Sequence, residues 1–365
     1  MPSQLEWLVS LSPWPEEFGL GRMHALLTEL GEPQHAYRAI HVVGTNGKST
    51  ATRRTAAFLA REGLSVGAYT SPHVAGWGER VQVDGEDADL EAALERVAPA
   101  AERLGATQFE VLTAAALAEF AAAGVHVAVV EAGLGGRLDA TNVLDAEVVA
   151  LTNVSLDHTD VLGDTREAIA DEKLAVIAPG SAVVLGEPEW ASRARAQGAR
   201  RVVFSDDVGR AAAEAFLGRS LENEVEIALP GRFDRVGDDV FAGAHNPAGV
   251  EWLVERLPRA DYVVVASILA DKDADAMLQA LSRAGDTLVA TTSHSARARS
   301  ADELAARAEP FFDSAEAVAD PVAALARARE LAGDEGAVLV TGSLYLLADL
   351  TVRTERVPWG SSASV

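Results

Sequence analysis

The architecture follows from Ile40-His41-Val42-Val43-Gly44-Thr45-Asn46-Gly47-Lys48-Ser49-Thr50. An apolar β-branched run enters a turn with two glycines, and Gly-Lys-Ser-Thr then opens a helical stretch. Glycines let backbone N–H groups approach phosphate oxygens, and a helix N-terminus attracts negative charge. Lys48 adds a cation, and the hydroxyl of Ser49 or Thr50 is a ligand for Mg²⁺. The stretch predicts a phosphate-binding loop; the alternative is a strand–turn–helix with incidental glycines.

Strand-like and helix-like segments alternate along the rest of the chain, which predicts an α/β fold with parallel sheets covered on both faces. The expected strands are Ile40–Val43, His126–Glu131, Val148–Thr152, Ala182–Leu185, Val202–Ser205, Tyr262–Ala266, Thr287–Thr291 and Ala337–Thr341. The expected helices include Leu90–Leu104, Thr113–Ala123 and Pro321–Leu331. A polar stretch before Pro230-Gly231 marks a boundary. We expect residues 1–229 to form one α/β domain and residues 230–365 a second, smaller one.

Composition excludes several classes of protein. The 31 basic and 55 acidic residues give a net charge of −24, which argues against binding nucleic acid or an anionic membrane. The chain has no cysteine, so disulfides, zinc–thiolate sites and cysteine nucleophiles are excluded. The sequence predicts no membrane span and no secretion signal, and we therefore expect a cytoplasmic protein.

Lysine is scarce in this chain. Only three of the 31 basic residues are lysines, namely Lys48, Lys173 and Lys272, and the rest are arginines. Such a bias points to lysine being kept where a guanidinium cannot replace an amine. Taken alone, Lys173 in a helical stretch is typical of a surface residue.

Polar residues follow two further predicted strands. Glu131 ends one strand and enters the glycine-rich loop Ala132–Asn142, and Asp157-His158 lies just past another strand. Ligands bind at the carboxyl ends of strands in open α/β sheets, and Mg²⁺ prefers carboxylate oxygens. Glu131 is therefore a candidate metal ligand. The alternatives are a capping glutamate in a flexible loop and, for Asp157-His158, a polar turn.

The predicted second domain carries three weaker motifs, Leu229–Phe233, Gly243–Pro247 and Leu269–Asp273. Pro230-Gly231-Arg232 is equally typical of a linker turn, and His245-Asn246-Pro247 is equally typical of a helix cap. None of the three predicts a site on its own.

In this order, the motifs resemble the folylpolyglutamate synthase/dihydrofolate synthase family, a branch of the Mur ligases. The resemblance covers nearly the whole chain and is carried by Gly44–Thr50, Tyr69–His73, Glu79–Val81, Phe109–Thr113, Glu131–Asn142, Leu156–Leu162, Glu172-Lys173, Leu229–Phe233, Ala244–Pro247, Asp271–Asp273 and Gly342–Leu344. The string EAGLGGRLDATN is especially specific. The resemblance implies a Mur-ligase-like domain with a phosphate loop, followed by a smaller Rossmann-like α/β domain that closes over ATP and binds glutamate.

The resemblance implies an ATP-dependent amide ligase. The carboxylate of dihydropteroate or a reduced folate attacks the γ-phosphate of MgATP, and the amino group of L-glutamate displaces phosphate from the acyl phosphate. The form of the motifs favours an enzyme with both synthase activities. The resemblance also implies that the substrates are small molecules only, that the protein is a monomer, and that it binds two Mg²⁺ ions and can bind a monovalent cation.

Residue roles are implied by the same resemblance. Gly44, Thr45, Asn46, Gly47, Lys48, Ser49 and Thr50 correspond to the ATP phosphate loop, and Arg232, His245 and Asn246 to nucleotide contacts in the second domain. The metal ligands correspond to Ser71, Glu131, His158 and Lys173, with Ser49 or Thr50; Lys173 matches a carbamylated lysine. Lys48, Lys173, His158 and Glu131 are the expected catalytic residues. Substrate contacts correspond to Ser71, His73, Arg80, Phe109, Glu110, Leu138, Asp139 and Ala140.

Departures from the family pattern concern the nucleoside. Ser49 follows Lys48 directly, where the family has an intervening glycine. Ala242 replaces an aspartate, Arg210 replaces an asparagine that normally helps hold adenosine, and the segment after the Arg210 helix is short. Three other functions remain possible alternatives.

They are a folylpolyglutamate synthase without dihydrofolate synthase activity, another Mur-type amino-acid ligase, and a nucleotide-binding protein without catalytic activity.

Overall fold

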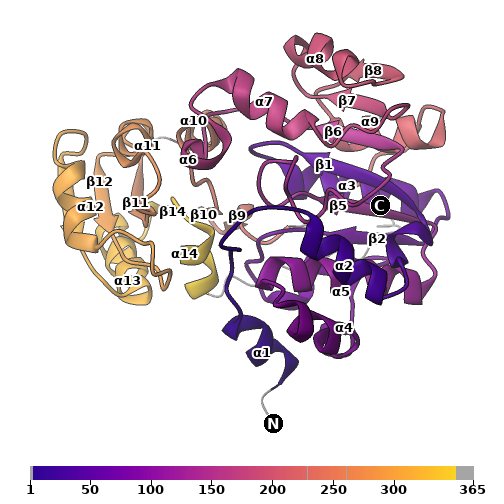
Figure 1. Cartoon of the computed structure of the whole chain (residues 1–365). Coiled ribbons are helices and arrows are strands. Elements are labelled where there is room, and N and C mark those ends of the chain that lie inside the picture. The colour runs from indigo at the N-terminus through magenta and orange to yellow at the C-terminus, as the bar shows by residue number, and fades with distance from the viewer. Residues whose placement is uncertain (1–2, 228, 260, 351–365) are drawn as a thin grey trace. The chain divides into compact units, whose positions relative to one another are not determined.

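The computed structural model describes residues 3–227, 229–259 and 261–350 and divides into two compact units (Figure 1). The first unit comprises the described residues 3–72 and 77–227, and the second comprises 73–76 and 229–350. Both are α/β units. The second expected domain reaches Val365, but residues 351–365 lie outside the described residues.

The first unit is built on an eight-stranded sheet in the order β4-β3-β2-β5-β1-β6-β7-β8. The strands from β2 to β8 in this order run parallel, and β3 and β4 add an antiparallel edge. The carboxyl ends of β5, β1 and β6 therefore lie side by side. The bounds are β1 Arg38–Val43, β2 Val66–Tyr69, β3 Val81–Val83, β4 Glu86–Asp87, β5 Val127–Glu131, β6 Val148–Leu151, β7 Ala182–Leu185 and β8 Arg201–Phe204.

Helices cover both faces of this sheet because the buried strands are apolar on both sides. On one face, α3 and α9 pack against Ile40, Val42 and their neighbours. On the other face, α1, α2, α4 and α5 cover one half and α7 and α8 the other. The bounds are α1 Gln4–Ser10, α2 Gly21–Glu29, α3 Lys48–Arg61, α4 Leu90–Leu104, α5 Gln108–Ala123, α6 Thr159–Leu162, α7 Arg166–Leu174, α8 Ala191–Ala196 and α9 Val208–Leu217, with 3-10 turns at Pro33–His35, Trp77–Arg80 and Pro188–Trp190.

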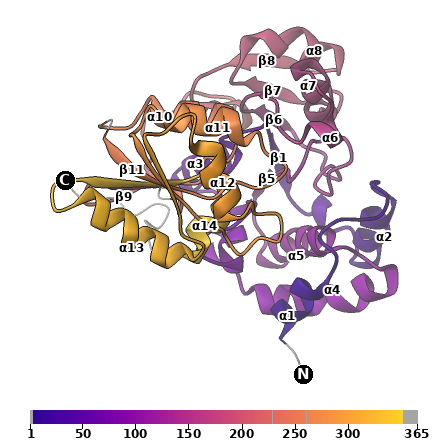
Figure 2. The same ribbon diagram turned by 90° about the vertical axis from the view of Figure 1, so that its left-hand side faces the viewer.

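The second unit has a six-stranded sheet in the order β13-β12-β11-β14-β10-β9, parallel except for the β9–β10 hairpin. Helices α10, α11 and α12 pack on one face, and α13 and α14 on the other (Figure 2). The bounds are β9 Arg232–Val236, β10 Asp239–Ala242, α10 Pro247–Val254, β11 Tyr262–Ala266, α11 Ala274–Leu281, β12 Thr287–Ala290, α12 Ala301–Ala308, β13 Ser314–Ala317, α13 Pro321–Ala332, β14 Ala337–Thr341 and α14 Leu344–Asp349.

The predicted α/β class is confirmed, and all eight expected strands are present within two residues of their bounds. Helix α5 is the main correction, because it begins at Gln108 rather than Thr113. The β-prone residues Phe109, Val111 and Leu112 concealed its first turn, which a capping box of Thr107 and Glu110 stabilises. In the described part of the chain, no helix combines the length and apolarity needed to cross a bilayer.

Candidate active site

The predicted phosphate loop joins β1 to α3 and leaves the helix N-terminus open for an anion. The N-cap residue of α3, Gly47, adopts a left-handed conformation with φ of 78° and has no side chain with which to cap the helix. Backbone N–H groups of the first helical turn therefore keep the arrangement that binds phosphate oxygens. Lys48, the first residue of α3, donates from Nζ to the Thr45 carbonyl oxygen at 3.2 Å and thus lies over the loop.

The segment after β6 holds this loop in place. Asn153 accepts hydrogen bonds from the Thr45 and Asn46 amides, each at 2.9 Å. Thr152 donates from Oγ1 to the Asn46 carbonyl oxygen at 2.7 Å. A Cβ on Gly44 would lie 1.9 Å from Thr152 Oγ1, so only glycine fits there. Thr152 and Asn153 are not among the predicted site residues, although they lie at the end of, and directly after, the predicted strand Val148–Thr152.

Glu131 contacts two of the other predicted ligands, Ser49 and Ser71, at the carboxyl ends of the strands. It is the last residue of β5 and is 1% exposed. Its Oε1 accepts from Ser49 Oγ at 3.2 Å, and its Oε2 accepts from the Ser71 amide at 3.1 Å. Of the two candidate hydroxyls, Ser49 is the one directed at Glu131, whereas Thr50 is half-buried in the same helical turn.

The oxygen donors of this group suit Mg²⁺, which takes carboxylate, hydroxyl and substrate phosphate oxygens. No group of three or more His, Cys, Asp or Glu side chains is placed to hold a metal in the described ranges 3–227, 229–259 and 261–350. A metal at Glu131 would therefore be completed by hydroxyls, water or phosphate oxygens, as is usual for Mg²⁺ bound with a nucleotide.

Lys173 lies beneath the phosphate loop and is not a surface residue. It is near the end of α7, is 4% exposed, and donates from Nζ to the Gly44 carbonyl oxygen at 2.8 Å. Burial, and to a smaller extent the positive charge of Lys48, lower the pKa of Lys173 to about 7 against opposing effects of Asp157 and Asp139. The amine is therefore neutral in a large share of molecules at neutral pH.

His158 lies beside Asp157 at the start of α6. Its backbone is left-handed, with φ of 51°, and its amide donates to Asp157 Oδ1 at 3.0 Å. The imidazole Nε2 lies 3.9 Å from the same oxygen. Asp157 is 9% exposed, and its charge acts on Lys173, so this pair belongs to the surroundings of the phosphate loop.

The glycine-rich loop packs between α5 and α7. A Cβ on Gly133 would lie 2.4 Å from Phe109 Cζ, and one on Gly136 would lie 2.6 Å from the Glu172 carbonyl oxygen. Because Gly133 and Gly136 have no side chains, the loop lies in direct contact with Phe109 and with the helix that carries Lys173. Within the loop, Leu138 is 45% exposed, whereas Asp139 and Ala140 are buried.

Asp139 organises the loop from inside. Its Oδ2 accepts from the Leu134 amide at 2.7 Å, and its Oδ1 accepts from the Thr141 amide at 3.0 Å. Burial raises the pKa of Asp139, while these N–H donors act in the opposite direction.

Glu110 and Arg80 already have partners within the first unit. Glu110 Oε2 accepts from the Thr107 amide and hydroxyl, both at 2.8 Å, and from Arg22 Nε at 2.7 Å. Glu110 therefore caps α5 and ties it to α2, a role that sequence analysis missed. The Arg80 guanidinium lies 4.5 Å from the centre of the Trp77 ring.

In the second unit, two of the three expected nucleotide residues, His245 and Asn246, lie at the start of α10. Asn246 caps this helix by accepting from the Gly249 amide at 2.8 Å, and it is 1% exposed. His245 Nδ1 lies 2.8 Å from the Gly243 carbonyl oxygen. Arg232 begins β9, and its amide donates to the Leu229 carbonyl oxygen at 3.1 Å. His73 belongs to the 73–76 segment of this unit and is half-buried.

A polar cluster in the second unit was not predicted. Ser267 Oγ lies 3.2 Å from Ser293 Oγ, past the carboxyl ends of β11 and β12. His294 follows, with its amide donating to Asp349 Oδ2 at 3.0 Å and its ring against Tyr345. The string TTSHS after a predicted strand was the available signal.

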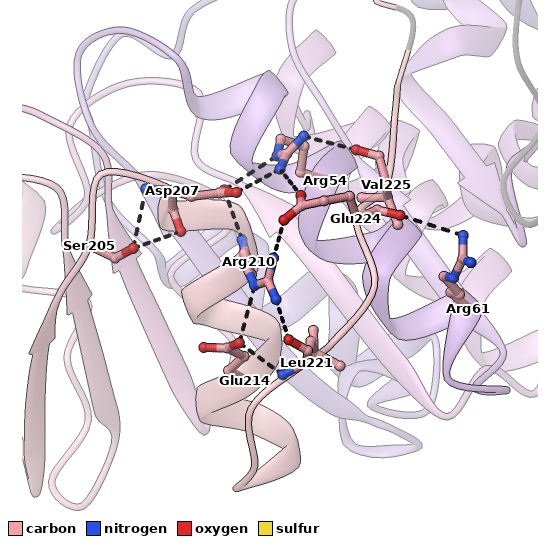
Figure 3. A network of polar contacts seen from close by, with 9 residues as sticks. All are labelled: Arg54, Arg61, Ser205, Asp207, Arg210, Glu214, Leu221, Glu224 and Val225. Carbon is pink, nitrogen blue, oxygen red and sulfur yellow. Dashed lines mark hydrogen bonds and ion pairs between the residues drawn. The ribbon is translucent and has the colours of Figure 1, made fainter.

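Arg210 anchors the segment after α9 (Figure 3). Its guanidinium donates to Glu214 at 3.2 Å, and also to Glu224 and to the Leu221 carbonyl oxygen. Arg54 supports the same segment by donating to the Val225 carbonyl oxygen at 3.0 Å. The departure at position 210 thus has a structural role in holding the chain that leads to the second unit.

Comparison with protein families places two domain matches along the chain. The Mur ligase middle domain matches residues 42–233, and the Mur ligase glutamate ligase domain matches residues 231–344. The dihydrofolate synthase/folylpolyglutamate synthase of Escherichia coli is 33% identical over 95% of this chain and 94% of that protein. The protein of the same name from Mycobacterium tuberculosis is 33% identical over 82% of this chain and 80% of that protein.

Solved structures are similar over the whole fold. Mycobacterium tuberculosis folylpolyglutamate synthase complexed with ADP has a TM-score of 0.90 at 29% identity, covering 96% of this chain and 98% of that chain. E. coli FolC in complex with DHPP and ADP has a TM-score of 0.84 at 30% identity, covering 96% and 97%. A bifunctional folylpolyglutamate synthase/dihydrofolate synthase with Mn, AMPPNP and L-glutamate bound has a TM-score of 0.84 at 29% identity, covering 96% of this chain and 97% of that chain.

Proposed function

The chain belongs to the folylpolyglutamate synthase/dihydrofolate synthase family of Mur ligases, and we propose that it joins L-glutamate to both dihydropteroate and reduced folates at the expense of ATP. The observation that carries the proposal is the convergence of Lys48, Ser49, Glu131 and Lys173 on one phosphate loop. The expected class, an ATP-dependent ligase with a nucleotide and a divalent metal, agrees with the relatives.

The reaction proceeds in two balanced steps. A carboxylate oxygen of the folate substrate attacks the γ-phosphorus of ATP, the bond to the β-phosphate oxygen breaks, and ADP leaves. The amine of L-glutamate then attacks the acyl carbon, phosphate leaves, and the nitrogen loses a proton as the amide forms. The protein contributes by positioning reactants and neutralising charge.

Residues 44–50 serve this chemistry by binding the phosphates of ATP. Their backbone N–H groups and the α3 dipole neutralise negative charge, and Lys48 contributes a mobile ammonium. Support comes from the glycine at the N-cap of α3 and from the hydrogen bonds that Thr152 and Asn153 make with the loop.

Magnesium would be held by Glu131 and Ser71 with Ser49 or Thr50, and a second ion by His158 and Lys173. The ions, when bound, neutralise phosphate charge and orient the γ-phosphate for attack. The oxygen donors at Glu131 fit a hard cation. We also propose that a monovalent cation binds near the two Mg²⁺ ions.

Lys173 is proposed to carry a carbamate, formed from its neutral amine and CO₂. The buried position beside the phosphate loop supports this role, because a carbamate there would face Lys48 and metal rather than solvent. Arginine cannot form this group. Intact-protein mass spectrometry under bicarbonate should find 44 Da added to the wild type, since that is the mass of CO₂, and none added to Lys173→Arg. The same variant should lose ligation while keeping its fold.

The folate substrate is proposed to contact residues of the phosphate-loop unit and the following turn, namely Ser71, His73, Arg80, Phe109, Glu110, Leu138, Asp139 and Ala140. The packing of Phe109 against Gly133 and the exposed side chain of Leu138 support this assignment. Glu110 contributes by fixing the start of α5 that carries Phe109.

The second unit is proposed to supply Arg232, His245 and Asn246 to the nucleotide and to bind L-glutamate. Carboxyl ends of parallel strands are where such units bind ligands, and the Ser267–Ser293–His294 cluster supports this location. We further propose that the enzyme is monomeric and cytoplasmic. Light scattering tests whether it is a monomer.

The experiment incubates purified protein with MgATP and L-glutamate plus either dihydropteroate or tetrahydrofolate, followed by mass spectrometry. Both products heavier by one glutamyl residue are expected. Extension of tetrahydrofolate alone would restrict the enzyme to folylpolyglutamate synthase. No product with either acid, but turnover with another, would indicate a different Mur-type ligase. ATP binding without any ADP release would indicate a nucleotide-binding protein.

A further inference from the structure

We propose that His41 and Thr141 are positioning residues that hold Asp139 and, through it, the glycine-rich loop in the geometry that binds the folate substrate. The inference rests on the proposed function, which places Asp139 in the substrate site. It assigns roles to two buried side chains that the phosphate chemistry does not use.

His41 connects the strand of the phosphate loop to the glycine-rich loop. It lies in the middle of β1, between Val130 of β5 and Val149 of β6, and is fully buried. Its Nε2 lies 2.8 Å from Thr141 Oγ1, and Thr141 Oγ1 in turn donates to Asp139 Oδ1 at 2.5 Å. An apolar residue would be the ordinary choice at such a site, so the imidazole needs an explanation.

The hydrogens can be assigned from the partners. Asp139 accepts from the Leu134 and Thr141 amides, as an ionised carboxylate does. The Thr141 hydroxyl then donates to Asp139 and accepts from His41 Nε2–H. Nδ1 of His41 has no partner among the described residues. When Nε2–H donates to Thr141, Nδ1 of His41 carries a lone pair. If the Thr141 hydroxyl instead donated to Nε2, Nδ1 would carry a buried N–H without an acceptor, which is rare.

The chain of hydrogen bonds fixes the loop from within. Asp139 reaches back to the Leu134 amide and forward to the Thr141 amide, so its carboxylate closes residues 134–141 on themselves. His41 attaches this closed loop to the central strand. Because His41 is wholly buried, it acts through Thr141 and exchanges no proton with a substrate.

The test compares Thr141→Val, which removes the hydroxyl, with Thr141→Ser, which keeps it. Thr141→Val should raise the KM for dihydropteroate about tenfold or more, the effect of one hydrogen bond to a charged group. The KM for ATP should change by less than about twofold, because the phosphate loop keeps its own supports. Thr141→Ser should stay within about threefold of the wild type.

Two further measurements separate positioning from loss of stability. His41→Leu should raise the same KM, and the double variant should be no worse than the more impaired single variant, because both act through one chain. Hydrogen exchange of residues 133–141 should accelerate in Thr141→Val, but not in Thr141→Ser or over residues 44–50.

Different outcomes test the proposed function and the positioning role of His41 and Thr141. A wild type that turns over neither folate substrate overturns the proposed function, and loop exchange then still decides the positioning role. An active wild type whose Thr141→Val variant keeps its KM for dihydropteroate and its loop exchange overturns the inference. A parallel rise in the KM for ATP would also overturn it.

Discussion

Mild acid should destabilise the first unit through His41. Burial lowers the pKa of this imidazole from 6.5 to about 4. The unfolded chain therefore binds a proton between these pH values while the folded chain does not. Stability is unaffected well above pH 6.5 and falls as the pH drops from there towards 4, as expected for a buried neutral histidine that must become charged.

The size of the effect follows from the two pKa values. Each pH unit between them is worth about 1.36 kcal/mol, so the full loss approaches about 3.4 kcal/mol. Between pH 7.5 and pH 5 the expected loss is about 2 kcal/mol. Titrating carboxylates add their own contributions, and a variant without the imidazole, His41→Gln, has the same carboxylates and serves as the reference.

Hydrogen exchange of β1 and β5 amides reports the free energy of opening of this unit. Wild type should lose about 2 kcal/mol more than His41→Gln between pH 7.5 and pH 5. Equal losses in the two proteins would contradict the prediction, because they would mean that His41 gains no proton on unfolding over this range.

Three other perturbations test particular contacts. Gly136→Ala places a Cβ 2.6 Å from a backbone carbonyl of α7, so urea unfolding should show a loss of about 1–3 kcal/mol. Gly19→Ala, which meets nothing within 4 Å, is the control; equal stabilities would contradict the predicted clash. Glu131→Gln should raise the Mg²⁺ concentration for half-maximal ADP formation roughly tenfold or more, and an unchanged requirement would remove Glu131 from the metal site. Arg210→Ala should speed cleavage by a Glu-specific protease in the segment after α9, with sites in the second unit cut as before; unchanged cleavage would show that Arg210 does not anchor the segment.

Local patterns predicted the central strands well because buried parallel strands are continuously apolar. β5 and β14 follow this pattern up to their last residues, Glu131 and Thr341, and β1 follows it except at Arg38 and His41. The β9–β10 hairpin and the short strand β2 were not predicted. β9 is partly exposed and polar, and β2 has only four residues, one of them glycine. Their strand structure depends on pairing with neighbours that a local pattern does not include.

In the candidate site, too, some residues could be predicted from the local sequence and others depend on long-range contacts. Gly44–Thr50 and Glu131 could be singled out because each follows an apolar strand directly. The position of Lys173 could not be read from its own helix, where it is typical of a surface residue. Its partner, the Gly44 carbonyl oxygen, is 129 residues away in sequence. The cradle of Thr152 and Asn153 depends on the β1–β6 register in the same way.

The central claim is that a substrate carboxylate becomes an acyl phosphate on this enzyme. The most direct measurement uses dihydropteroate labelled with ¹⁸O in both carboxylate oxygens, with MgATP and L-glutamate, and determines the isotope content of the released phosphate. Each released phosphate should contain one ¹⁸O atom, because that oxygen attacks the γ-phosphorus and stays with it. Amide product accompanied by unlabelled phosphate would contradict it.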